Sequence, residues 1–285
     1  MKFYSPLRYP GGKNKLAKFI SNICELNDIG GHYVEPYAGG ASVALHLLLE
    51  GKISKVTIND YDKAIYAFWY AVLNHTEQFC RKIQRTNITI ENWEKQKLIH
   101  NNKEKESDLF KLGFATFFLN RTNRSGIIDG GPIGGRAQTG NYLIDCRFNK
   151  KELKERIRLI AAHKKQITLC NLDALELVKK LKKDGLNKDT IFYFDPPYYL
   201  KGPSLYLSHY KHGDHTKVGE EISKIKRARW IVSYDNTPEI KEIYEGFDTL
   251  EYTFYHTAHT ARVGREVLFY SSGLRVPTTS TPTKY

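Results

Sequence analysis

A short apolar and aromatic run ends at an aspartate, and two prolines and a tyrosine follow, in the order Asp195-Pro196-Pro197-Tyr198. Because proline cannot donate to a sheet ladder, the predicted strand must end where the prolines begin. The Asp195 carboxylate and the Pro196 carbonyl are hydrogen-bond acceptors, and the Tyr198 ring is a flat surface for stacking. Together they suit the activation of an amino group on a planar base, because two acceptors draw the nitrogen lone pair out of conjugation. A strand that simply ends in a proline turn with a capping aspartate is the alternative.

A second strand is predicted at 33–35, and a turn of small residues, Pro36-Tyr37-Ala38-Gly39-Gly40, leads from it into a helix. The third strand, at 55–60, ends in Asp60. An acid at this place in a strand–turn–helix–strand unit typically accepts hydrogen bonds from ribose hydroxyls. The turn does not fit G-x-G-x-x-G, which argues against NAD and FAD. An ordinary unit of this kind, in which Asp60 only caps a helix, is the alternative.

Three other segments contain residue types that bind ligands. The loop at 5–13 ends in Gly11-Gly12-Lys13 before a predicted helix, a setting that can hold an anionic group, although the Walker A spacing is missing. Asp173 opens a helix after a strand predicted at 166–170, and it suits an N-cap, a ligand to an adenine amino group, or both at once. In His212-Gly213-Asp214-His215, a cap by Asp214 on a helix at 216–226 explains the pattern better than a metal site does.

Strands and helices alternate along the chain except between residues 62 and 148, which form a predicted, mainly helical insertion. The alternation predicts a Rossmann-like sheet, and the last two strands, at 250–256 and 265–270, have the spacing of an antiparallel hairpin. The insertion contains a glycine-rich segment at 120–136, and the candidate contact residues in it are Asn120, Arg121, Asn123 and Arg124. The glycines suggest an exposed hairpin or loop rather than core, and arginine and asparagine read base edges and phosphates. A flexible surface loop fits this segment equally well.

The chain has 285 residues and a net charge of +13, with a pI of about 9.4. This charge favours a polyanionic partner such as nucleic acid, because Lys and Arg gain affinity by releasing counterions from phosphates. The four cysteines show neither CxxC pairing nor zinc spacing, which is typical of reduced thiols in an intracellular protein. With no signal peptide and no long apolar span, a soluble, cytoplasmic protein without a metal is expected. Residues 274–285 are expected to be a disordered tail.

Four motifs in one order resemble those of the Dam-like DNA adenine-N6 methyltransferases: Tyr9-Pro10-Gly11-Gly12-Lys13, the turn at 35–40, Asn59-Asp60, and the Asp195 motif. The similarity spans the chain from Ser5 to about Tyr270 and follows the α-type arrangement, with target recognition inserted before the Asp195 motif. It implies an α/β fold, a Rossmann-like S-adenosylmethionine-dependent methyltransferase sheet of seven strands whose last strand is antiparallel. Residues 1–61 and 149–273 would form the catalytic domain, and 62–148 a mainly helical target-recognition domain bearing a β-hairpin.

The resemblance also implies a role for each motif residue. The cofactor would contact Tyr9, Lys13, Glu35, Pro36, Tyr37, Gly39, Asp60, Asp173 and Asp195, with Asp60 at the ribose and Asp173 at the adenine ring. Asp195, Pro196, Pro197 and Tyr198 would hold the target adenine, which must leave the duplex because its amine is buried in base pairing. Asn120, Arg121, Asn123 and Arg124 would contact double-stranded DNA. Ser125-Gly126 stands where the family commonly has Asn-Gly, so the target sequence is the least transferable inference.

Several other functions compete with this one. Cytosine N4 and an RNA adenine also present an exocyclic amine, but Asp rather than Ser before Pro-Pro favours a DNA adenine by resemblance. A catalytically silent nucleic-acid-binding module is disfavoured by the intact Asp60, Asp195 and Tyr198. A nicotinamide oxidoreductase is disfavoured by the missing glycine fingerprint and the basic charge. The resemblance places the protein in a bacterial or phage setting, where a cognate restriction endonuclease can accompany it.

Overall fold

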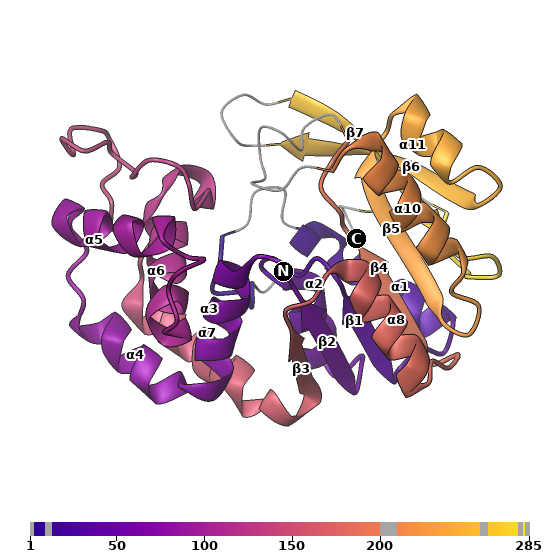
Figure 1. Cartoon of the computed structure of the whole chain (residues 1–285), viewed down its shortest axis with the longest axis horizontal. Coiled ribbons are helices and arrows are strands. Elements are labelled where there is room, and N and C mark those ends of the chain that lie inside the picture. Colours follow the sequence, from indigo (N-terminus) through magenta and orange to yellow (C-terminus); the bar gives the residue numbers. More distant parts are fainter. Residues whose placement is uncertain (1–2, 9–12, 200–209, 257–261, 279–281, 283–285) are drawn as a thin grey trace.

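The computed structural model describes residues 3–8, 13–199, 210–256, 262–278 and 282. Its centre is a seven-stranded sheet in the order β3-β2-β1-β4-β5-β7-β6 (Figure 1). The strands are β1 His32–Glu35, β2 Lys55–Asn59, β3 Ile167–Cys170, β4 Thr190–Phe194, β5 Arg229–Asp235, β6 Asp248–His256 and β7 Arg262–Tyr270. Strands β1 to β5 pair in parallel, whereas β7 is antiparallel to both β5 and β6. The predicted seven-stranded sheet with its antiparallel last strand is therefore confirmed.

The strand order reverses between β1 and β4, which pair side by side at the middle of the sheet. From β1 the chain moves outward to β2 and β3, and from β4 it moves the other way to β5. In open α/β sheets, ligands bind beyond the carboxyl ends of the strands at such a switch point. Glu35, at the end of β1, and Asp195, directly after β4, both lie at this point.

Helices cover both faces of the sheet because successive strand residues point to opposite sides. On β4, Tyr193 belongs to the core on one face, while Phe192 and Phe194 belong to the core on the other. The first face packs against η1 Lys13–Leu16, α1 Ala17–Leu26 and α2 Ser42–Leu49. The second face packs against α8 Ala174–Asp184, α10 His212–Ser223 and α11 Pro238–Ile243. A strand buried on both faces can hold its carboxyl end rigidly.

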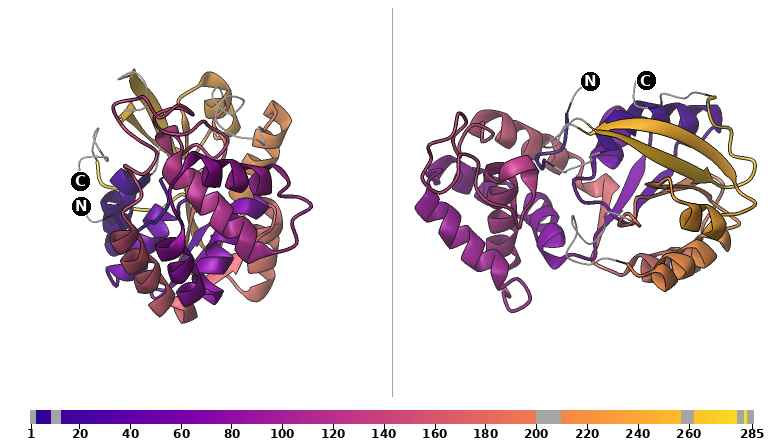
Figure 2. Two further views of the ribbon diagram at one scale, coloured as in Figure 1. Left: turned by 90° about the vertical axis from the view of Figure 1, so that its left-hand side faces the viewer. Right: turned by 90° about the horizontal axis from the view of Figure 1, so that it is seen from above.

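The insertion forms a helical unit beside the sheet (Figures 1 and 2). It contains α3 Lys63–Asn74, α4 Thr76–Arg85, α5 Ile90–Asn101, α6 Leu109–Thr122 and η2 Arg124–Gly126. The next helix, α7 Lys150–Ala162, follows the insertion in the chain, packs against α3 and α4, and is joined to β3 by η3 Lys164–Gln166. Gly113 of α6 allows α3 to pack closely, because a Cβ there would lie 2.3 Å from the Ala67 carbonyl oxygen. The Trp69 indole of α3 donates a 2.9 Å hydrogen bond to the Gly39 carbonyl, so α3 contacts the predicted cofactor turn directly.

Two local predictions are wrong in part. Helix α10 begins at His212, not at residue 216, so Asp214 lies in its first turn; its carboxylate still caps the helix, because it accepts a hydrogen bond from the Lys211 amide as part of a capping box. The expected disordered tail is ordered at its start, where Leu274 is buried and the Arg275 backbone exchanges two hydrogen bonds with the Asn27 side chain. Sequence composition missed the second feature because a side-chain amide, not a regular element, holds the segment.

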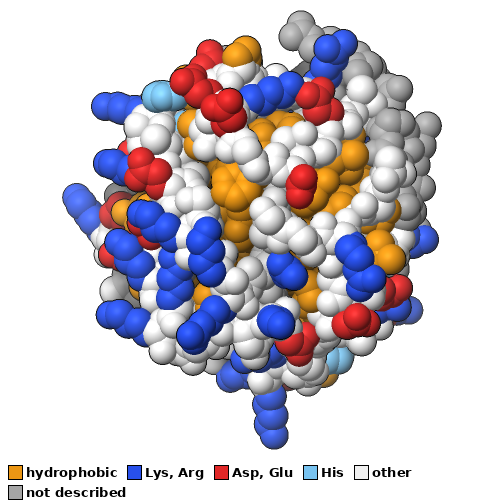
Figure 3. Space-filling model, turned by 90° about the vertical axis from the view of Figure 1, so that its right-hand side faces the viewer, with side chains coloured by type: hydrophobic (Ala, Val, Ile, Leu, Met, Phe, Trp, Pro, Cys, Tyr) orange, Lys and Arg blue, Asp and Glu red, His pale blue; other side chains and the backbone are white. Residues whose placement is uncertain are grey.

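Basic residues are spread over the surface. Figure 3 shows Lys and Arg side chains over much of the face at the right of Figure 1, with Asp and Glu among them. On this face, charge alone therefore does not mark out a nucleic-acid-binding patch. Within the described ranges, no helix has the length and apolar character needed to cross a membrane.

Candidate active site

Three carboxyl groups meet where β1, β2 and β4 end. Glu35 is the last residue of β1, while Asp60 and Asp195 directly follow β2 and β4. Burial raises the pKa of Glu35 well above its usual value, and the nearby charges of Asp195 and Asp60 raise it further. The Glu35 carboxyl is 4% exposed, and its bond from the Ala44 amide is long, at 3.4 Å. This edge of the sheet is therefore an acidic, partly desolvated setting.

Asp195 is held by groups from two other elements. The Ser233 hydroxyl on β5 donates a 2.7 Å hydrogen bond to Oδ1, and the Lys13 ammonium lies 3.4 Å from the same oxygen. The side chain retains 23% of its exposure. Burial raises the pKa of Asp195, whereas the Lys13 charge and the Ser233 bond oppose that rise. The carboxylate is thus fixed in direction but still open on one side.

Lys13 joins the N-terminal motif to the Asp195 motif. Its buried ammonium donates to the Tyr198 hydroxyl at 2.8 Å and to Glu266 Oε2 at 3.0 Å. Glu266 Oε1 also accepts from the Tyr198 hydroxyl at 2.5 Å. Burial alone would lower the pKa of Lys13, but the charges of Asp195 and Glu266 outweigh it and place the pKa well above its usual value. The ammonium therefore stays protonated between two carboxylates.

The turn after β1 is clamped by β2. The Asn59 amide donates to the Pro36 carbonyl and to the Leu172 carbonyl, each at 2.9 Å, and its oxygen accepts from the Leu172 amide. Gly39, at φ 46°, donates its amide to Asp60 Oδ2 at 2.9 Å. A fully buried asparagine thus fixes the two turns that flank the predicted cofactor site to one another.

Asp60 carries the most informative electrostatic shift. Burial raises its pKa to about 7, while the hydrogen bonds from the Gly39 and Asp62 amides act in the opposite direction. Each oxygen accepts one of these backbone bonds, and a carboxylate oxygen can accept more than one hydrogen bond. The side chain can therefore still receive hydroxyl donors.

The remaining predicted site residues lie around this edge of the sheet. Asp173 caps α8, accepting from the Leu175 and Glu176 amides, so the predicted cap is confirmed while its contact with an adenine stays a prediction. The Tyr37 hydroxyl is 3.1 Å from that of Tyr210. Pro196 is buried and Pro197 half-buried after β4. Tyr9 lies outside the described residues.

The glycine-rich segment differs from its prediction. Asn120 and Asn123 are fully buried, not exposed. The Asn120 amide accepts from the Arg8 amide and donates to the Arg8 and Gly126 carbonyls. Asn123 donates to three carbonyls of the loop and accepts from the Trp93 indole. These amides hold backbone in place, so in this arrangement neither is available to read a base. The predicted hairpin is reduced to one antiparallel bridge, Asn123 to Pro132.

The two arginines of the segment differ in setting. Arg124 is exposed at the start of η2. Arg121 is half-buried, its guanidinium donates to the Arg147 carbonyl, and burial together with the charges of Arg8 and Arg156 lowers its pKa to about 10. Of the four predicted DNA contacts, Arg124 is therefore the side chain most open to a partner.

We expect Asn120→Ala to lower the free energy of unfolding by roughly 2–4 kcal/mol, because the half-buried amide and carbonyl of Arg8 and the buried Gly126 carbonyl each lose a partner. Urea unfolding of the variant and the parent would measure this. Arg124→Ala is the matched control from the same loop and should change stability by less than about 0.5 kcal/mol. A stable Asn120→Ala variant that binds DNA poorly would instead show that this amide is a DNA contact.

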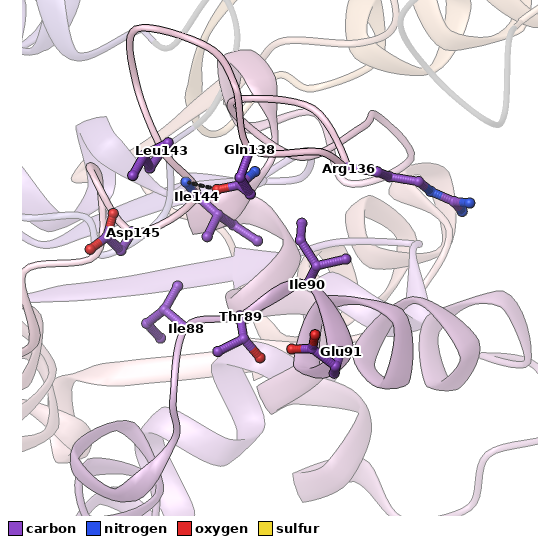
Figure 4. A pocket seen from close by; sticks show the side chains of 9 residues that line it. All are labelled: Ile88, Thr89, Ile90, Glu91, Arg136, Gln138, Leu143, Ile144 and Asp145. Carbon is purple, nitrogen blue, oxygen red and sulfur yellow. Dashed lines mark hydrogen bonds between the residues drawn. The ribbon is translucent and has the colours of Figure 1, made fainter.

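A pocket of about 560 Å³ lies in the helical unit, away from the acidic edge of the sheet. Its lining residues come from the start of α5 and from the loop before α7, and Figure 4 shows that Gln138 bonds the Ile144 amide at its wall. None of the predicted catalytic or cofactor residues lines it. The pocket is therefore separate from the site around Asp195.

Sequence reasoning missed three residues of this site: Asn59 as a clamp, Ser233 and Glu266. Asn59 belongs to the Asn59-Asp60 motif, so this motif could have indicated its role. Ser233 and Glu266 lie in strands with no distinctive local motif, and only the sheet order brings them beside Asp195 and Lys13. A polar residue facing inward on a predicted strand is the one signal that could have marked them.

A model of the D12 class N6 adenine-specific DNA methyltransferases matches residues 9–256. The chain belongs to this family. The resemblance seen in the sequence is thereby confirmed, and the methyltransferase acts on DNA as an adenine-specific enzyme of the class. It is also 24% identical over 263 residues to the type II methyltransferase M.MjaIII of Methanocaldococcus jannaschii, covering 85% of this chain and 88% of that protein.

The chain also aligns with solved structures, at low similarity. Two structures of the rRNA methyltransferase aviRa from Streptomyces viridochromogenes align with 92% of this methyltransferase and with 86% and 85% of their own chains. The sequence identity is 10% and the TM-score 0.39 in both cases. A likeness at that level carries no argument about substrate.

Proposed function

We propose that this methyltransferase moves a methyl group from S-adenosylmethionine to N6 of an adenine that is flipped out of duplex DNA. The observation that carries the proposal is the arrangement of Asp195, which is directed by Ser233 and Lys13 beside the buried Tyr198. An acceptor and a ring at one strand end suit an exocyclic amine on a planar base. The family supplies the coarser statement, methylation of adenine in DNA.

The residues at the ends of β1 and β2 fit the proposed cofactor. S-adenosylmethionine carries ribose hydroxyls and a positive charge, and this edge of the sheet holds the carboxyls of Glu35 and Asp60 close together. Among the described residues, the buried Glu35 carboxyl has only a long bond from the Ala44 amide, so it favours a ligand that brings a donor or a positive charge. Asp60 would hold the ribose, and the turn that contains Gly39 would lie against the cofactor.

Bound S-adenosylmethionine would supply an electrophilic methyl group on a sulfonium. The protein would position the target nitrogen for attack in line with it. Within the described part of the chain Ser233 and Lys13 both contact Oδ1 of Asp195, so Oδ2 is the oxygen that would accept a hydrogen of the adenine amine. The Pro196 carbonyl would accept the other hydrogen, and Tyr198 would stack on the base. These groups would localise the lone pair on nitrogen. As the N–C bond forms, the bond between the methyl group and the sulfonium would break to leave a neutral thioether, and the amine would lose one proton to solvent.

For DNA contact we expect Arg124→Ala to weaken DNA binding about 5- to 100-fold or to relax recognition at one base pair, as the loss of one phosphate or base contact does. Cofactor affinity should stay within about twofold, because the segment lies outside the cofactor site. DNA binding measured over a salt series would check this, with Arg227→Ala as a control at the opposite end of the sheet, before β5. Unchanged affinity, salt slope and methylation pattern would remove Arg124 from the interface.

The proposal is tested by incubating the purified protein with methyl-labelled S-adenosylmethionine and with duplex DNA, single-stranded DNA or RNA. Digestion to nucleosides identifies the product. We expect label in N6-methyladenine from duplex DNA and a thermal stabilisation by the cofactor but not by NAD. Label in N4-methylcytosine or in RNA would replace the proposed substrate, and no stabilisation by the cofactor would overturn its placement.

A further inference from the structure

Glu266 is a buried acid in the middle of the antiparallel strand β7. It lies opposite Tyr252 of β6 and is 2% exposed. Its Oε1 accepts from the Tyr198 hydroxyl, and its Oε2 accepts from the Tyr252 hydroxyl at 2.5 Å and from the Lys13 ammonium at 3.0 Å. Residues far apart in the chain thus meet at one carboxylate, two of them from motifs of the site.

The carboxylate changes how Lys13 acts on Asp195. The Lys13 ammonium lies 3.0 Å from Glu266 and 3.4 Å from Asp195, so the shorter ion pair belongs to Glu266. A buried ammonium that faced Asp195 alone would close on it, because a buried charge seeks its partner strongly. Asp195 would then spend its acceptor capacity on the lysine. With Glu266 present, the Lys13 ammonium orients the Asp195 carboxylate but is not drawn fully onto it.

The same carboxylate also fixes the stacking ring. The Tyr198 hydroxyl donates to Glu266 and accepts from Lys13, so both ends of its hydrogen-bonding capacity are used. A ring held by its hydroxyl in this way cannot turn freely about its side-chain torsions. The ring orientation that a flipped base would meet is set before any base arrives.

The charge state agrees with this geometry. Burial would raise the pKa of Glu266, but the Lys13 charge and the bonds from Tyr198 and Tyr252 outweigh it and lower the pKa below its usual value. Glu266 is therefore the ionised partner of the Lys13 ammonium, which also lies beside Asp195.

We propose that Glu266 is a positioning residue of the methyl-transfer site, which holds Lys13 back from Asp195 and fixes the Tyr198 ring for the incoming base. This inference rests on the proposed function. It differs from a purely structural role, in which the carboxylate would only join β6, β7 and the N-terminal segment. The two roles predict different results for a charge-removing substitution.

The test is Glu266→Gln, which is nearly isosteric and leaves an oxygen to accept from tyrosine but removes the charge that holds Lys13. We expect single-turnover methyl transfer to fall about 10- to 100-fold at saturating cofactor and DNA. Glu251→Gln is the matched control, an exposed glutamate on β6 that pairs with Lys241, and it should transfer at the parent rate. Folding is checked by thermal unfolding and circular dichroism for each variant.

A second readout needs neither substrate nor cofactor. With ¹³C-labelled lysine, the Lys13 resonance is assigned by its absence in Lys13→Met and followed by NMR against pH. Loss of one of its two carboxylates should bring the Lys13 pKa down by about one unit or more in Glu266→Gln. Because Lys13 and Glu266 act as a unit, Lys13→Met with Glu266→Gln should be no slower than the worse single variant.

The outcomes separate the possible failures. A folded Glu266→Gln that transfers methyl at the parent rate overturns the positioning role and leaves the proposed function standing. A slow variant whose Lys13 resonance titrates as in the parent, or whose effect multiplies with Lys13→Met, shows a structural role and also overturns it. A parent that methylates no adenine removes the proposed function, and the Lys13 titration then still decides whether Glu266 controls the ammonium.

Discussion

Replacing Asp195 by asparagine is expected to slow single-turnover methyl transfer by roughly 10²–10³-fold, the usual loss for one preorganised hydrogen-bonding group. The change keeps the shape of the side chain but replaces one accepting oxygen by an amide that donates. Ser233 and Lys13 both contact Oδ1 and both donate to it, so they will select the amide oxygen for that position. The donating NH2 would then face the adenine amine, where an acceptor is needed.

The measurement is transfer from labelled cofactor to duplex DNA in one turnover, with cofactor affinity and thermal unfolding as controls. Cofactor affinity should change less than the rate, because the adenine amine, not the cofactor, loses its acceptor. The complementary substitution, Asp195→Glu, keeps the charge but moves the carboxylate, and methyl transfer by this variant should also be slow. A folded Asp195→Asn variant that transfers at the parent rate would leave Asp195 as no more than a strand end.

The second large effect is expected at Asp60. Asp60→Ala should weaken S-adenosylmethionine binding by roughly 2–4 kcal/mol, because the two charge-assisted hydrogen bonds that we propose to the ribose would be lost. Part of the loss will come from the turn, since the Gly39 amide also loses its acceptor. Asp60→Asn separates the two, because its oxygen can still accept from Gly39.

The Asp60 carboxylate also predicts a pH dependence. Its pKa is raised from 3.8 to about 7 by burial, so the folded protein holds this proton more tightly than the unfolded chain. Asp60 therefore makes the free protein less stable as pH rises from about 4 to about 7. Ribose hydroxyls need the ionised form, so cofactor affinity should fall up to about tenfold per pH unit below pH 7.

Calorimetric titration of the cofactor at pH 5.5 to 8.5 would measure the cofactor affinity of each variant and its dependence on pH. Asp60→Asn should bind weakly and lose the pH dependence near 7, and Asp28→Asn, an exposed aspartate before β1, should behave as the parent. Parent-like affinity in Asp60→Ala would count against the whole placement of the cofactor at the ends of β1 and β2.

The sequence predicted the sheet well because its signals are local. The run before Asp195, the turn at 36–40 and the hairpin of β6 and β7 each follow from strand periodicity and from proline or glycine chemistry. The order in which strands lie beside one another is not local. Glu266 and Ser233 have no motif of their own, and they reach Asp195 and Lys13 only because β7 is inserted next to β5.

In the glycine-rich segment, residue type led to a wrong prediction of exposure. Asparagine and arginine beside several glycines indicated an exposed loop, yet the two asparagines are buried because their amides satisfy loop carbonyls. An asparagine is chemically suited both to reading a base and to holding backbone. Residue type alone does not choose between these uses, whereas burial does.

We propose that this methyltransferase modifies N6 of adenine in DNA through the Asp195 site. The most direct test is to express the parent and Asp195→Asn in a host that lacks DNA methylation and to analyse the genomic DNA for modified bases. We predict N6-methyladenine within a recurring sequence in DNA from the parent, and little or none from Asp195→Asn at equal soluble expression. Methylated cytosine, unmodified DNA from a folded parent, or equal N6-methyladenine from both proteins would contradict the proposed role of Asp195 in adenine methylation.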